Sequence, residues 1–125
     1  MNMAARIRSQ RALQSAITEF DLFNRNKPNS TPVQRAAAIA HAIIVKRPFK
    51  DGNKRTAETV ASHILESYNC RPLVIYNWRY AEYNLVTVKR AHTLVANGGV
   101  SRDLLADLYA DILAFPGCVL LFTLR

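Results

Sequence analysis

The stretch Lys46-Arg47-Pro48-Phe49-Lys50-Asp51-Gly52-Asn53-Lys54-Arg55-Thr56-Ala57 separates two segments whose apolar residues repeat with helical spacing. Its centre, Asp51-Gly52-Asn53, cannot continue a helix, because glycine and Asx residues favour turns and positive φ. The stretch therefore predicts a tight loop that runs into a helix N-terminus. Free backbone N–H groups and the positive end of the helix dipole favour an anion at such a place. Since Lys54 and Arg55 add two cations there, the pattern indicates a phosphate site, although a solvated basic turn between helices would look similar.

The residues on both sides of the loop predict helices. Thr31-Pro32 combines a hydroxyl N-cap with proline at the first helical position, and the small residues that follow predict a helix in the middle of a bundle. That helix ends before Pro48, because the residue preceding a proline resists the α conformation. Asn53 is expected to cap the next helix. Its predicted inward positions are Ala57, Val60, Ala61, Ile64, Leu65 and Tyr68.

The rest of the chain predicts three more helices. An amphipathic helix is expected over residues 6–20, starting near Ser9 or Gln10, with a loop or short hairpin over residues 21–31. Leu73-Val74-Ile75-Tyr76 predicts a strand or an extended loop. Residues 80–96 predict a helix that ends at Asn97-Gly98-Gly99. Ser101 is expected to cap the last helix, whose predicted inward positions are Leu104, Leu105, Leu108, Ile112 and Leu113.

These elements predict a mainly α fold, a compact helical bundle with a short flap or hairpin before the central helix. The chain has 125 residues, which is enough for one hydrophobic core, so residues 1–125 are expected to form a single domain. The apolar tail at residues 115–125 could pack as a strand, cover a groove or be a cloning remnant. No apolar run reaches about 18 residues and no apolar signal is visible at the N-terminus, so a cytoplasmic protein without a membrane partner is expected.

The charge of the chain predicts an anionic partner. Seventeen Lys and Arg against nine Asp and Glu give a formal net charge of +8, which suits a nucleotide, a nucleic acid or an acidic protein. Few aromatic residues interleave with the basic ones, which favours a phosphate pocket over a nucleic-acid track. Two cysteines and three histidines show no ligand spacing, so no metal site made of side chains alone is predicted, and His63 is expected at the surface.

The string Arg47-Pro-Phe-Lys-Asp-Gly-Asn-Lys-Arg resembles the Fic/Doc signature H-P-F-x-D/E-G-N-K/G-R at every position but the first, where Arg47 replaces the family's histidine. The form with Lys54 is typical of Doc ("death on curing") toxins, whereas adenylylating Fic proteins usually have glycine there. The resemblance extends over residues 6–113, but only the loop is specific. It implies a Fic/Doc-type helical bundle, with residues 21–31 as the flap that aligns a target protein.

The resemblance also implies a role for each residue of the loop. Asp51 would hold Mg²⁺, and Gly52, Asn53, Lys54 and Arg55 would bind the phosphates of ATP. Phe49 would anchor the loop in the core. Lys54 would crowd the adenylylating pose, so that phosphate rather than AMP is transferred to a protein hydroxyl, as on elongation factor Tu. Such a protein would be the toxin of a toxin–antitoxin pair, with an antitoxin as partner.

Arg47 occupies the position of the catalytic histidine, which acts as general base in the family. A guanidinium has a pKa above about 12 and only donates hydrogen bonds, so Arg47 cannot accept a proton at neutral pH. His41 lies six residues earlier on the same helix, about 240° around its axis, and does not replace the base. With Arg47 at this position, the resemblance implies a Doc-like transferase that is inactive or weakened. The alternatives are a non-catalytic nucleotide-binding or nucleic-acid-binding basic module and an interaction protein whose groove accepts a partner.

Overall fold

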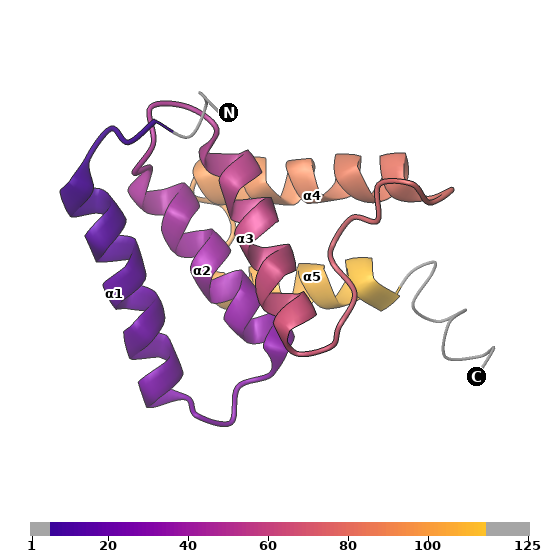
Figure 1. Ribbon diagram of the computed structural model, residues 1–125, viewed down its shortest axis with the longest axis horizontal. Helices are drawn as coiled ribbons and strands as arrows, with labels where there is room; N and C mark the ends of the chain where they lie inside the picture. The colour runs from indigo at the N-terminus through magenta and orange to yellow at the C-terminus, as the bar shows by residue number, and fades with distance from the viewer. Residues whose placement is uncertain (1–5, 115–125) are drawn as a thin grey trace.

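The computed structural model describes residues 6–114, and within that range the chain forms five helices and no strand. They are α1 (Gln10–Asn26), α2 (Pro32–Lys46), α3 (Asn53–Ser67), α4 (Ala81–Ala96) and α5 (Arg102–Leu113). Figure 1 shows α1 and α3 on either side of α2, with α4 and α5 crossing α3. Of the five helices, α2 contacts all four others. The predicted mainly α bundle is confirmed. The apolar tail at 115–125 lies outside the described residues.

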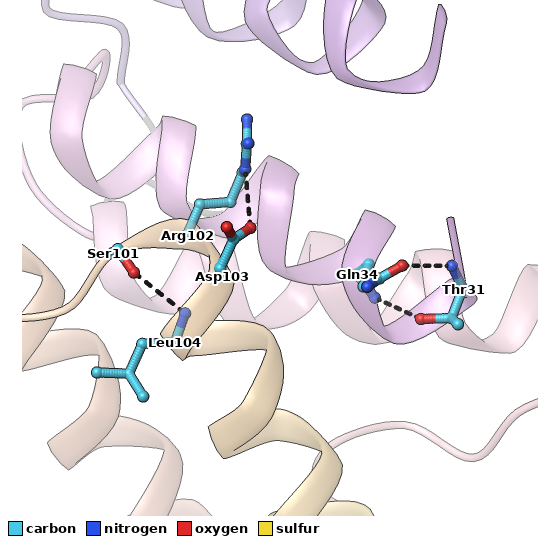
Figure 2. A network of polar contacts seen from close by, with 6 residues as sticks. All are labelled: Thr31, Gln34, Ser101, Arg102, Asp103 and Leu104. Atoms are coloured by element: carbon cyan, nitrogen blue, oxygen red, sulfur yellow. Dashed lines mark hydrogen bonds and ion pairs between the residues drawn. The ribbon is translucent and has the colours of Figure 1, made fainter. Parts of the chain in front are cut away.

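The central position of α2 follows from its small side chains. Ala36, Ala37, Ala38, Ala40 and Ala42 are all buried, so neighbouring helices can approach the α2 backbone closely. The helix begins where predicted. The Thr31 hydroxyl accepts a hydrogen bond from the Gln34 N–H, and the Gln34 side chain accepts one from the Thr31 N–H, which forms a capping box (Figure 2).

The last two helices also have the predicted ends. Gly98 follows α4 with a φ of 82°, a conformation that favours glycine, and the Ser101 hydroxyl caps α5 by accepting from the Leu104 N–H at 3.1 Å (Figure 2). Leu105, Ile112 and Leu113 are buried as expected and Leu108 is partly buried. The prediction that Leu104 faces inward is wrong. Leu104 lies in the first turn of α5, and its side chain is 45% exposed.

The first helix is longer than predicted, and no hairpin precedes α2. Residues 21–26 continue α1, and only residues 27–31 connect it to α2. The polar sequence Asn24, Asn26 suggested a loop, but Phe23 is buried, with the Arg102 guanidinium 4.6 Å from its ring centroid. This tertiary contact outweighs the weak local helix propensity of the asparagines.

Two corrections concern the segment around the end of α3. Tyr68 was predicted to face inward, but it is the C-cap of α3, 44% exposed, with the Arg35 guanidinium 5.6 Å from its ring centroid. Of the predicted alternatives for residues 73–76, the extended loop is correct and the strand is wrong. Leu73 and Val74 are buried, and the Leu73 N–H donates to the Ser62 hydroxyl instead of to a neighbouring strand. Among residues 6–114, no helix combines the length and apolarity that crossing a lipid bilayer requires.

Candidate functional site

The loop between α2 and α3 contains two residues in the left-handed conformation. Arg47 ends α2 with a φ of 51°, and Gly52 precedes α3 with a φ of 78°. The second position suits glycine, which carries no Cβ penalty there, whereas Arg47 accepts a strained backbone. Pro48 between them is buried and Phe49 packs partly buried against the core, as the predicted anchor of the loop.

The side chain of Asn53 joins the start of α3 to Phe49 on the other side of the loop through two hydrogen bonds. Its Oδ1 accepts a hydrogen bond from the Phe49 N–H at 3.0 Å, and its Nδ2 donates to the Phe49 carbonyl at 2.9 Å. The prediction that Asn53 caps α3 is wrong, since Gly52 is the N-cap and Asn53 is the first helical residue. The amide reaches back across the turn because glycine at position 52 lets the chain reverse so tightly.

Replacing Asn53 with alanine is expected to lower the free energy of unfolding by about 1–3 kcal/mol, because two partly buried groups of the Phe49 backbone lose their partners. Urea unfolding of the native chain and the variant measures the difference. Asn97→Ala is a matched control, since Asn97 also lines the pocket described below but is exposed. A loss in the control as large as that in Asn53→Ala would contradict the assigned role.

The segment before α1 supports the other side of the loop. The Arg8 N–H donates to the Pro48 carbonyl at 2.7 Å, and the Lys50 N–H donates to the Arg6 carbonyl at 2.9 Å. The Arg8 guanidinium donates to the carbonyls of Lys46 and Arg47, at 3.1 and 2.7 Å. These contacts satisfy carbonyls at the C-terminal end of α2, which have no partner inside the helix. The loop is thus fixed from both sides before any ligand arrives.

The first N–H groups of α3 have no side-chain cap. Ser9, Thr31 and Ser101 cap α1, α2 and α5 with side-chain oxygens, whereas α3 and α4 have no side-chain cap. Within residues 6–114, no acceptor is bonded to the N–H groups of Asn53, Lys54 and Arg55. Such unpaired donors, together with the helix dipole, favour an anion.

A pocket of about 970 Å³ lies at this open end, between α3 and α4. It brings together all the residues that the sequence singled out, namely Arg47, Asp51, Gly52, Asn53, Lys54 and Arg55. Lys50 and Lys89 also line it, which raises the number of basic residues around the pocket to five. Among the described residues, none of these five forms an ion pair. Unpaired cations around one pocket suit a ligand with several negative charges.

On the α3 side of the pocket, the Glu58 carboxylate is bonded to two hydroxyl groups. Glu58 is only 8% exposed and accepts hydrogen bonds from the Tyr76 hydroxyl at 2.9 Å and from the Ser62 hydroxyl at 3.0 Å. Both of its oxygens are therefore occupied. Asp51, in contrast, is exposed and has no hydrogen bond or ion pair within residues 6–114. It is the free carboxylate of the pocket.

His92 of α4 lies beneath the first turn of α3. The side chain is buried, and its Nε2 shares a short hydrogen bond with the Tyr109 hydroxyl. Burial lowers the pKa of His92 to about 4, against which the bond to the Lys54 backbone acts. The imidazole is thus neutral at pH 7, and its hydrogen bond to the Tyr109 hydroxyl joins α4 to α5.

Comparison with known proteins identifies the family of the chain. The sequence matches the Fic/DOC family over residues 3–65, half of the chain. The chain belongs to the Fic/DOC family. The matched region covers α1, α2 and the whole loop and ends within α3. Neither the curated proteins nor the solved structures gave a match. Membership supports a Fic-type transferase function in general terms.

In this Fic/DOC chain, most of the pocket residues that sequence reasoning missed lie outside the loop, and Lys50 lies within it. Glu58, Tyr76, Lys89 and His92 are among the residues that line the pocket outside the loop. Tyr76 and the two residues of α4, Lys89 and His92, lie beyond the matched region. Lys89 and His92 are three residues apart and share a helix face with Val88, a pattern that was available in the sequence. That pattern does not distinguish a pocket wall from an ordinary amphipathic helix. His63, which was expected at the surface, is exposed.

Proposed function

We propose that this Fic/DOC protein binds Mg²⁺-ATP in the pocket between α3 and α4 and is a Doc-like toxin of a toxin–antitoxin pair. As a Doc-like toxin, it would transfer phosphate or AMP from ATP to a hydroxyl of a target protein such as elongation factor Tu. One observation carries the proposal: the uncapped N–H groups of α3 and five unpaired basic residues converge on one pocket.

The residues present fit ATP. The pocket volume of about 970 Å³ lies in the range of small-molecule sites and far exceeds what one phosphate needs. The N–H groups of Asn53, Lys54 and Arg55 would bind phosphate oxygens, with the side chains of Lys54 and Arg55 adding charge. Because the Asn53 amide is already bonded to Phe49, it would support the loop rather than bind the nucleotide directly.

The residues present also fit Mg²⁺. Magnesium in proteins prefers one or two carboxylates together with phosphate oxygens. Asp51 supplies a carboxylate that no other described group occupies, whereas Glu58 is engaged by two hydroxyl donors. Asp51 would therefore hold the ion, which when bound neutralises charge on the phosphates.

The missing base is the reason for expecting weak or absent transfer. Arg47 lines the pocket but cannot accept a proton at neutral pH. His92 lines the same pocket, yet its Nε2 is bonded to the Tyr109 hydroxyl and the ring is buried. Arg47 instead adds a positive charge that would favour phosphate binding. The proposal is thus a nucleotide pocket that lacks its general base.

Replacing Arg55 with alanine is expected to weaken Mg²⁺-ATP binding by about tenfold or more, because a charge-assisted hydrogen bond contributes roughly 1.5–3 kcal/mol. Isothermal titration calorimetry of the native chain and the variant measures the change. Arg90→Ala is the matched control, since Arg90 is also exposed but does not line the pocket. Equal affinities for Arg55→Ala and the native chain would contradict the proposed site.

A further inference from the structure

The loop between α3 and α4 places one aromatic ring at the pocket without covering it. Tyr76 lines the pocket and is 65% exposed. Other aromatic rings of this loop have partners: Trp78 and Tyr80 pack edge to face at 5.5 Å, and the Arg71 guanidinium lies 5.6 Å from the Trp78 ring centroid. No aromatic or cationic group among residues 6–114 covers the ring of Tyr76. Its faces are available to a ligand.

The hydroxyl of Tyr76 is nevertheless fixed. It donates to Glu58 at 2.9 Å, and the second oxygen of Glu58 accepts from Ser62, whose own oxygen accepts from the Leu73 N–H. This chain of hydrogen bonds joins the loop to the side of α3. A ring held in this way loses little conformational freedom when a ligand packs against it.

The position of Tyr76 relative to the phosphate site suits the other end of a nucleotide. Glu58 lies five residues after Asn53, about 7.5 Å further along the helix axis, so the ring it anchors is displaced from the open N–H groups. Leu85 and Val88 of α4 line the same pocket and supply apolar surface. The pocket therefore combines a cationic part around the loop with an aromatic and apolar part.

We infer that the ring of Tyr76 packs against the nucleobase of the bound nucleotide, so that the pocket binds a nucleoside triphosphate more tightly than a bare triphosphate chain. The inference rests on the proposed function and adds to it the residue that recognises the base. Stacking on aromatic side chains suits this task, because every base has a π-face.

The test compares two ligands, ATP and inorganic tripolyphosphate, each with Mg²⁺, by calorimetry. We expect the native chain to prefer ATP and Tyr76→Ala to weaken ATP binding by about tenfold while changing tripolyphosphate binding less than about twofold. Tyr76→Phe keeps the ring and should retain a preference for ATP. Tyr68→Ala is the matched control, since Tyr68 is also exposed but lies outside the pocket, and should change neither affinity. Thermal unfolding of each variant shows that it is folded.

Three results would overturn the inference. They are equal native affinities for the two ligands, an unchanged ATP affinity in Tyr76→Ala, and an equal loss of both ligands in that variant, which would mean that the ring only supports the loop. Failure of the proposed function has a different signature. In that case the native chain binds neither ligand, before any variant is compared.

Discussion

Replacing Arg47 with histidine is expected to raise the rate of phosphate transfer from ATP to a protein target by about 10²–10⁴-fold, the usual contribution of a general base. The backbone at this position accommodates histidine, because its left-handed conformation is several-fold more frequent for histidine than for most residues. The surrounding support does not depend on the side chain, since Arg8 binds the carbonyl of residue 47. The rate is measured as γ-label transfer in a single turnover.

Arg47→Gln is the control for this gain. Glutamine removes the guanidinium as histidine does, but it supplies no base, so it should leave transfer at the native level. A gain in Arg47→Gln as large as in Arg47→His would show that the positive charge, and not the missing base, limits the reaction. No gain in either variant would contradict the assignment of position 47.

Acidification is expected to lower the free energy of unfolding by roughly 3 kcal/mol through His92 alone. The folded protein holds the pKa of His92 at about 4, mainly because the ring is buried, whereas the unfolded chain has the ordinary value near 6.5. Between these values the unfolded state binds more protons. This stability is therefore present above about pH 6.5 and is lost as the pH falls toward 4. Besides burial, the Lys54 backbone raises the pKa of His92 and the Lys54 charge lowers it. The Tyr109 hydroxyl is bonded to the ring, and Glu58 raises the pKa of Tyr109.

Urea unfolding between pH 7 and pH 4 measures this loss, and His92→Gln isolates it. The variant should be less stable than the native chain at pH 7 and should lose less stability on acidification. His41 contributes in the same direction in both proteins, because burial lowers its pKa while Glu19 opposes the shift. The same pH dependence in the variant and the native chain would contradict the role of His92.

The sequence was sufficient for features that depend on neighbouring residues. The caps Thr31 and Ser101 were predicted, because an N-cap hydroxyl bonds to a group three residues away. The loop residues that line the pocket were also singled out from the sequence. They are close neighbours in the chain, so a single turn brings them together.

Features that depend on distant contacts were missed. The end of α1 depends on burial of Phe23 under Arg102, and the Tyr76–Glu58 bond joins residues 18 positions apart. The role of Asn53 is an intermediate case. Its type suggested a cap, but only the shape of the loop shows that the amide returns to Phe49. The α4 wall with Lys89 and His92 carries no local signal beyond helical periodicity.

The central claim is that this Fic/DOC chain keeps the nucleotide pocket and lacks the base. The most direct test incubates the native chain with a bacterial lysate and with ATP labelled at the γ or the α phosphate, beside Arg47→His. We predict that the native chain transfers little or no label and that Arg47→His transfers the γ label only. Transfer by the native chain at the rate of Arg47→His would contradict the account, since it would require another base in the pocket.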